Sequence, residues 1–140
     1  MNMCPCGARG DASATCTCTG QRLAAYRAKL SRALLDRFDL VVTVPRPRAA
    51  ELAAGPAEPS SVVAQRVRAA RSMLAAAPLR RTDDADVLLS RAVDRLPLSG
   101  RGRARVARAA RTIAALAGSE EVLADHVAEA LAYRPPPELA

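Results

Sequence analysis

Residues 60–134 carry a repeated helical pattern that constrains the fold more than any other feature of the sequence. Apolar residues recur there at a spacing of three or four, and short breaks that contain Pro, Gly or Ser interrupt them. The stretch SSVVAQRVRAARSMLAA predicts a helix over residues 60–76, and DDADVLLSRAVDRL predicts another over 83–96. Two further helices are predicted over 99–118 and 119–134. This half of the chain therefore predicts a small helical bundle.

Terminal signals support these boundaries. For the helix predicted over 99–118, Ser99 is a good N-cap and Gly118 is a good C-terminal stop. Ser119 with acidic residues directly after it predicts the start of the last helix, and the prolines from Pro135 onward forbid its continuation.

The predicted helix over 99–118 has two chemically different faces. On a helical wheel its basic face holds Arg101, Arg105, Arg108 and Arg111. Its apolar face holds Val106, Ala109, Ile113 and Leu116. A solvated basic face is one interpretation, and a helix whose first arginine meets a phosphate group is the other.

Composition favours packed helices over an aromatic β-sandwich. The 140 residues include no Trp, one Phe and two Tyr, so a core must come from Leu, Val and Ala. Net charge is +7, and every basic residue except Lys29 is arginine. The charge fits a phosphate-binding surface, but a GC-rich genome also favours Arg and Ala, and the arginines are spread along the chain.

No apolar run reaches the roughly 20 residues that span a bilayer, and no signal peptide is recognisable, so we expect no membrane contact. We expect a cytoplasmic protein with reduced cysteines.

The first 59 residues are less regular. Residues 1–20 predict a loop, and short helices are predicted over 21–29 and from Ser31, which is a plausible cap. DLVVTVP then predicts one strand over 39–44, apolar on both faces and therefore buried in a sheet.

The chain divides into four predicted regions. Residues 1–45 precede a proline-rich linker over 46–59, the helical bundle occupies 60–134, and 135–140 form a tail.

Four cysteines form two C-x-C pairs within the first loop, namely Cys4, Cys6, Cys16 and Cys18. Four thiolates are a complete ligand set for tetrahedral zinc, although the spacing is not the usual C-x2-C. A loop without metal and a pair of disulfides are the alternatives, the latter disfavoured by the absence of a secretory context.

Other catalytic patterns are absent from the sequence. There is no G-x-x-x-x-G-K-[ST] loop to cradle phosphates, and no apolar strand ends in paired acids that would hold magnesium. His126, the only histidine, lies among apolar residues and is assigned no chemistry.

Several stretches in order resemble one known family: MNMCPCG, QRLAAYRAKLS, LLDRFDL, SSVVAQRVRAAR, LSGRGRARVARAARTIAALAGSEEV and HVAEALAYR. The sequence is similar to the C-terminal part of the magnesium chelatase-like AAA+ ATPases, the YifB/ComM competence helicase family. The resemblance implies a mainly α fold, in which a C-terminal piece of an AAA+ core, with one buried strand and short helices, precedes a helical lid.

The resemblance also implies roles for individual residues. Asn2 matches the sensor 1 residue that orients the attacking water, and Arg37 matches the arginine finger that reaches a neighbour's nucleotide. An ion pair with Asp36 or Asp39 is the alternative for Arg37. Arg101 best matches the sensor 2 arginine; nothing in the sequence separates it from Arg103 or Arg105.

The family implies ATP and Mg²⁺ as cofactors, and a ring, expected to be a hexamer, that acts on DNA. Because both Walker motifs are absent here, we expect no ATP hydrolysis by this chain alone. It would act with other AAA+ subunits or with an N-terminal half that this sequence does not contain. The alternative is a stand-alone basic nucleic-acid-binding module with a zinc loop, and a truncated product without activity is a third possibility.

The sequence departs from the family pattern at a few positions. Met3 replaces a usual proline, and Arg32-Ala33 replace a usual Gly-Pro. These changes affect the expected sensor 1 loop and the expected finger helix.

Overall fold

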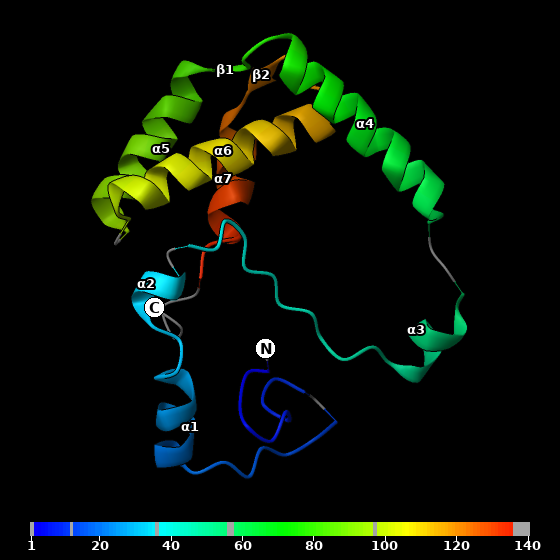
Figure 1. Ribbon diagram of the computed structural model, residues 1–140, viewed down its shortest axis with the longest axis vertical. Coiled ribbons are helices and arrows are strands. Elements are labelled where there is room, and N and C mark those ends of the chain that lie inside the picture. The colour runs from blue at the N-terminus through cyan, green and yellow to red at the C-terminus, as the bar shows by residue number, and fades with distance from the viewer. Residues whose placement is uncertain (1, 12, 36, 56–57, 97, 136–140) are drawn as a thin grey trace. The chain divides into compact units, whose positions relative to one another are not determined.

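The computed structural model describes residues 2–11, 13–35, 37–55, 58–96 and 98–135. Two compact units make up the chain: an N-terminal unit of Met1–Gly55 with Pro135–Ala140, and a C-terminal unit of Pro56–Arg134. Helices α1 to α7 and two short strands follow one another among the described residues (Figure 1). None of these helices is both long enough and apolar enough to cross a membrane. The mainly α class expected from the sequence is confirmed.

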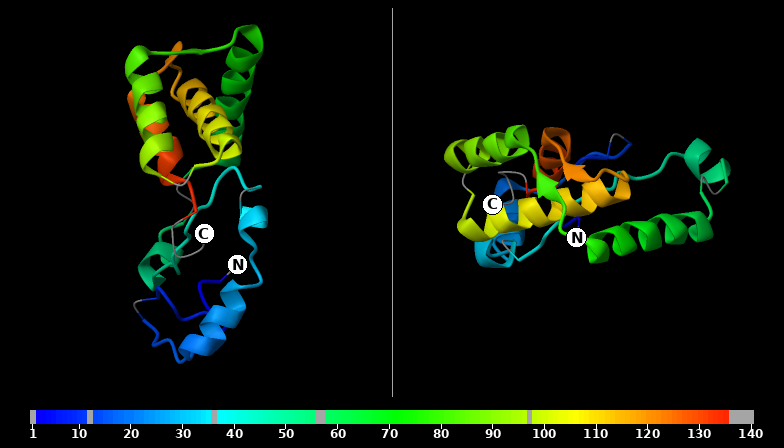
Figure 2. Two further views of the ribbon diagram at one scale, coloured as in Figure 1. Left: turned by 90° about the vertical axis from the view of Figure 1, so that its left-hand side faces the viewer. Right: turned by 90° about the horizontal axis from the view of Figure 1, so that it is seen from above.

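The C-terminal unit is built from four helices, α4 Ser60–Ala76, α5 Asp83–Arg95, α6 Gly100–Leu116 and α7 Ala124–Ala132. Helix α6 contacts the other three, and α7 also packs against α5 (Figure 2). The core that they share consists of Ala85, Leu89, Val106, Ala110, Ala114, Val122, Val127 and Ala130. Half of these residues are alanine, whose small side chain lets helices approach closely.

Helix α6 begins and ends as the sequence predicts. The Ser99 hydroxyl accepts a hydrogen bond from the N–H of Gly102 at 3.1 Å. At the other end Gly118 has φ +70°, and its N–H donates to the carbonyl of Ala115 at 3.1 Å. The N–H of Ser119 donates to the carbonyl of Ala114 at 2.9 Å, which completes a Schellman motif.

The predicted faces of two helices are only partly correct. Val106 of α6 is buried as expected, but Leu116 is 41% exposed and the predicted basic residue Arg111 is half-buried. The wheel assumed one covered face, whereas α6 is contacted by three other helices.

In helix α4, most of the apolar residues on the predicted buried face are exposed. Its bounds match the prediction, yet Val62, Val63 and Val67 are exposed and only Ala70 is buried. In the described part of the chain, this helix packs chiefly on α6.

The last predicted helix begins later than expected. Helix α7 starts at Ala124, and Glu121–Val122 form the short strand β2 instead of a first helical turn. This strand pairs in parallel with β1, Arg80–Arg81, in the register Arg80 to Glu121 and Arg81 to Val122. The pairing joins segments about 40 residues apart, so no local pattern could indicate it.

The N-terminal unit contains α1 Gly20–Arg27, α2 Arg32–Leu35 and α3 Ala49–Ala53. Thr19 caps α1, its hydroxyl accepting from the N–H of Arg22 at 3.3 Å. Ser31 caps α2 as predicted, its hydroxyl accepting from the N–H of Leu34 at 3.2 Å. Helix α3 lies inside the segment predicted to be a proline-rich linker, and the sequence analysis did not predict a helix there.

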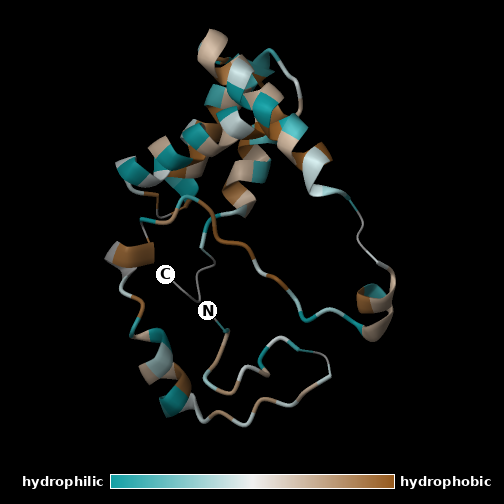
Figure 3. Ribbon diagram, turned by 45° about the vertical axis from the view of Figure 1, so that its right-hand side comes forward, coloured by the Kyte–Doolittle hydropathy of each residue, from teal (hydrophilic) through white to brown (hydrophobic). Residues whose placement is uncertain are grey.

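The buried strand predicted over 39–44 does not form. The segment has no strand pairing, and Leu40, Val42 and Val44 are 51%, 62% and 83% exposed. Coloured by hydropathy, the ribbon shows apolar stretches in coil as well as in the helices (Figure 3). A buried strand needs a neighbour on each edge, and no described part of this chain provides one.

Candidate functional site

The two C-x-C pairs of the first loop meet in space. One ligand sulfur from each of Cys4, Cys6, Cys16 and Cys18 lies within 4.8 Å of the others. The Sγ atoms of Cys4 and Cys6 are 3.3 Å apart, and the Sγ atom of Cys16 lies 3.7 Å from each of them. All four cysteines are free thiols, so the disulfide alternative has no support in the structure.

Two turns bring the pairs together. The N–H of Gly7 donates to the carbonyl of Cys4 at 3.1 Å, and Gly7 adopts φ +80°, a conformation that other residues rarely tolerate. Further along, the Asp11 carboxylate accepts from the N–H and the hydroxyl of Ser13, at 2.8 and 2.6 Å. The second pair, Cys16 and Cys18, therefore returns to the first.

The electrostatics of the cluster favour the thiolate at Cys4 and Cys6, whose pKa values are lowered, and oppose it at Cys18. The backbone hydrogen bond of Ala8, with the thiols of Cys4 and Cys18, lowers the pKa of Cys6 to about 6. A backbone hydrogen bond of Cys6 favours the Cys18 thiolate, but burial and the sulfurs of Cys6 and Cys16 prevail and raise the pKa of Cys18 to about 11. A bound cation would remove this conflict, because it stabilises every thiolate around it.

The sulfur spacing suits a tetrahedral metal ion. With metal–sulfur bonds of about 2.3 Å, the edges of an S₄ tetrahedron are about 3.8 Å long. The two separations of 3.7 Å agree with that length, the Cys4–Cys6 separation of 3.3 Å is shorter, and every pair of ligand sulfurs lies within 4.8 Å. These four cysteines can therefore hold a metal ion.

Asn2 lies beside this cluster. Its backbone carbonyl accepts a hydrogen bond from the hydroxyl of Tyr26, on α1, at 3.1 Å. Its side-chain Nδ2 lies over the bare face of Gly7, where an added Cβ would be 3.6 Å away. Sequence reasoning missed Tyr26, because nothing local links residues that are 24 positions apart.

Arg37 is exposed just beyond the end of α2. Its backbone N–H donates to the carbonyl of Leu34, in the last turn of the helix, at 2.9 Å. None of the ion pairs found among the described residues involves its guanidinium. Asp39, one of its two predicted alternative partners, is engaged in an interaction. The other predicted alternative partner, Asp36, lies outside the described residues.

A groove of about 790 Å³ crosses the N-terminal unit and includes Asn2 in its wall. Residues 6–11 of the cysteine loop line one part of it, and residues 40–46 line another. An ion pair between Arg46 and Asp11, 3.4 Å long, joins these two segments. Arg37 is not part of the lining, so the two predicted catalytic residues do not share this groove.

Arg101 lies in the C-terminal unit, exposed in the first turn of α6, and Arg103 is also exposed. Arg105 is half-buried and is engaged in an interaction. The sequence did not indicate Arg134, which reaches the start of α6: a Cβ added at Gly102 would lie 3.6 Å from its Nη2. Arg101 is thus one of several arginines near this helix end.

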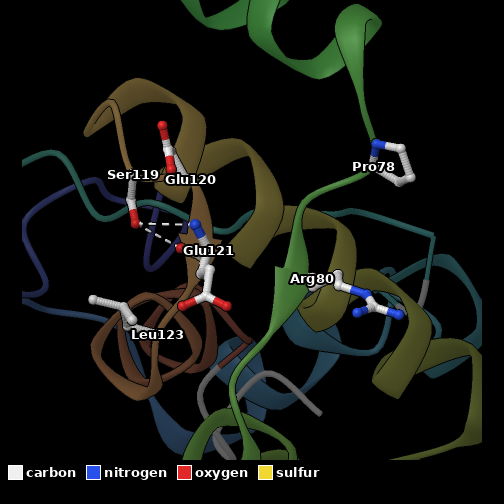
Figure 4. A pocket seen from close by; sticks show the side chains of 6 residues that line it. All are labelled: Pro78, Arg80, Ser119, Glu120, Glu121 and Leu123. Carbon is white, nitrogen blue, oxygen red and sulfur yellow. Dashed lines mark hydrogen bonds between the residues drawn. The ribbon is translucent and has the colours of Figure 1, made fainter.

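A shallow hollow of about 590 Å³ lies beside the two short strands and is lined by Pro78, Arg80, Ser119, Glu120, Glu121 and Leu123. Arg80 and Glu121 are register partners, yet their side chains point apart, while Ser119 bonds to the backbone of Glu121 (Figure 4). The charges of this hollow do not converge on a common point, and we assign it no function.

Comparison with known proteins matches two successive family models. Residues 1–52 match the model described as magnesium chelatase, subunit ChlI. Residues 74–134 match the model described as magnesium chelatase, subunit ChlI C-terminal.

Individual relatives agree with these matches. An uncharacterized protein of Mycobacterium tuberculosis is 36% identical over 152 residues, covering 95% of this chain and 30% of the relative. YifB of Escherichia coli and the competence protein ComM of Haemophilus influenzae are each 33% identical. Those two alignments cover 84% and 81% of this chain, and 26% of each relative. The chain thus spans less than a third of the length of these proteins, and it belongs to the magnesium chelatase-like family that includes YifB and ComM.

Proposed function

We propose that this chain supplies the sensor and arginine-finger residues for ATP hydrolysis in a ring-shaped AAA+ motor that acts on DNA. The observation that carries the proposal is the exposure of Arg37 beyond α2, where none of the ion pairs found among the described residues involves it. A guanidinium placed in this way is available to a second molecule.

The chemistry of phosphoryl transfer explains why an arginine is needed. Negative charge spreads over the oxygens of the transferred γ-phosphoryl group, and a planar, permanently charged guanidinium can bind two of them. A neighbour that supplies this group makes hydrolysis depend on ring assembly. Asn2 would orient the attacking water, and Arg101 would contact the nucleotide from the lid.

ATP and Mg²⁺ would be held mainly by residues outside this chain, because its sequence has no phosphate-cradling loop. Action on DNA is proposed from the family resemblance, and the net charge of +7 suits a phosphate-rich partner. A cytoplasmic location and a hexameric ring are part of the same proposal.

We propose zinc as the ion for the four cysteines. Four thiolates in a tetrahedron are a common structural zinc set, and a site without an open position stabilises structure and does not take part in catalysis. The alternative of a metal-free loop predicts no zinc after purification without chelators.

A chimeric protein tests the role of Arg37. The matching segment of YifB is replaced by residues 1–134 of this chain, and ATP hydrolysis by this parent chimera is compared with hydrolysis by its Arg37→Ala variant. An arginine finger contributes about 10³- to 10⁵-fold to the rate, so activity should fall by that order. Mixing this variant with a variant that lacks the P-loop lysine should restore part of the activity, because mixed rings contain sites with both groups intact.

Arg22→Ala is the matched control, since Arg22 is also exposed in the N-terminal unit. It should leave hydrolysis within about twofold of the parent, as expected for a surface residue. Loss of activity in Arg37→Ala without any recovery on mixing would remove the role in a neighbouring site.

A second candidate function is nucleic-acid binding by the chain alone. It is favoured by the exposed arginines of α6, namely Arg101, Arg103 and Arg108. Such a module should bind duplex DNA with a log-linear loss of affinity as salt rises. Weak binding without a salt slope would leave the motor component as the better account.

A further inference from the structure

The N-terminal unit has very little core of its own. Among its described residues only Cys4, Leu23 and Leu35 are buried hydrophobic residues, whereas the C-terminal unit has a continuous cluster. A chain segment of about 55 residues with so little buried apolar surface usually needs a metal or a covalent link to hold its shape. The four cysteines are the feature of this unit that can provide such a link.

Cys4, the buried member of the cluster, lies two residues after Asn2 in the sequence. The turn from Cys4 to Gly7 places Gly7 under the Asn2 amide group. The N–H of Arg9 donates to the Cys4 sulfur at 3.3 Å, which ties the end of the same turn to the cluster. The surface beneath Asn2 is therefore made of residues that the cysteines hold.

The backbone of Asn2 is held by α1. Tyr26 donates to the Asn2 carbonyl at 3.1 Å, and Tyr26 lies eight residues beyond Cys18. Cys18 and the cap residue Thr19 are adjacent, so the cluster also fixes where α1 begins. Both supports of Asn2, the turn and the helix, are thus anchored at cysteines of the cluster.

From this arrangement we infer that metal binding by the four cysteines positions Asn2, so that metal occupancy controls whether the sensor residue is ordered. The free energy of metal binding would stabilise the folded form of this loop, because only weak sulfur contacts connect the four cysteines when the metal is absent. In this inference the metal holds Asn2 in position, and the metal itself takes no part in the chemistry of ATP. The inference rests on the zinc and sensor assignments proposed above.

The sequence offers a direct probe, because Asn2 is its only asparagine. Labelling with ¹⁵N-asparagine gives one backbone amide signal and one side-chain NH₂ pair in an NMR spectrum of the full chain. Zinc is titrated into metal-free protein kept reduced. The expected result is replacement of one set of Asn2 signals by a second, dispersed set, complete at one equivalent of zinc.

Two variants separate positioning from mere binding. Tyr26→Phe removes the hydroxyl that holds the Asn2 carbonyl. It should still bind one zinc, measured by metal analysis, but the Asn2 signals should broaden or split. Cys18→Ser should lose stoichiometric binding and keep the metal-free Asn2 signals at every zinc concentration. Tyr133→Phe, in the other unit, is the matched control and should behave as the parent.

Each outcome decides the inference. Stoichiometric zinc binding with unchanged Asn2 signals shows that the metal stabilises the loop without governing Asn2, and this overturns it. Failure to bind zinc overturns it as well. Neither result bears on the ATP hydrolysis test of Arg37→Ala, in which the parent and the variant carry the same cysteine loop, so the two proposals can fail separately.

Discussion

The backbone N–H of Leu123 donates a hydrogen bond to Nδ1 of His126 at 3.1 Å. His126 is the third residue of α7, so its ring takes the place that a Glu or Gln side chain has in a capping box. The only histidine of the chain therefore closes the start of a helix, and its contact explains why α7 begins at Ala124 although no Ser or Thr precedes it.

Replacing His126 tests this contact. His126→Ala leaves the N–H of Leu123 without its acceptor and should lower the free energy of unfolding by about 0.5–1.5 kcal/mol. His126→Gln can still accept the same hydrogen bond and should recover most of that loss. Urea denaturation followed by circular dichroism measures both. Equal stability of the Ala and Gln variants would show that the hydrogen bond contributes nothing.

Gly118 and Gly100 form a matched pair at the two ends of α6. A Cβ at either position meets no atom within 4 Å, but Gly118 has φ +70° whereas Gly100 lies in the first helical turn. Gly118→Ala should destabilise the protein by about 1 kcal/mol or more through backbone strain. Gly100→Ala should be neutral or stabilising by up to about 1 kcal/mol. Thermal unfolding measures the melting temperature of each variant. A similar decrease of the melting temperature in both variants would contradict this account.

Substitutions at Leu89 and Val44 compare a buried position in the core of the C-terminal unit with an exposed position in the segment over 39–44. Leu89 is fully buried in the cluster, and Leu89→Ala should cost about 2–5 kcal/mol. Val44 is 83% exposed, and Val44→Ser should change stability by no more than about 0.5 kcal/mol. A large loss for Val44→Ser in the isolated chain would mean that this segment is covered in solution.

The thiol reactivity of the metal-free cluster follows from its electrostatics. Because the pKa of Cys6 is lowered to about 6, this cysteine is a thiolate at neutral pH and should be alkylated first. Its alkylation rate should fall as pH drops through about 6, where the thiolate becomes protonated. Peptide mass spectrometry after brief treatment with iodoacetamide identifies the modified cysteine. A half-maximal rate near pH 8.5, the value of an ordinary thiol, would contradict the prediction, and bound metal should protect all four cysteines.

Local signals were enough to predict much of the helical structure. The bounds of α4 and α5, the Ser31 and Ser99 caps and the Gly118 stop all follow from residues within a few positions of one another. The pairing of β1 with β2 did not follow, because it depends on backbone groups far apart in the sequence. The strand predicted over 39–44 failed for a related reason: a run of β-branched and apolar residues indicates a preference for a sheet but does not supply the partner strands.

The candidate site divides in the same way. Cys4, Cys6, Cys16 and Cys18 were recognisable from their spacing, and Asn2 and Arg37 from their place in family motifs. The contacts around them were not, because Tyr26 reaches Asn2 across 24 positions and Arg46 reaches Asp11 across 35.

The sequence by itself therefore determined the helical character and many of the helix ends, since periodicity and capping act over one or two turns, and it supplied the candidate site residues. Only the tertiary structure decided which helix faces are covered, where α7 begins and what holds Asn2 in place. Those features depend on contacts between distant segments, whose free energy arises only when the chain has folded.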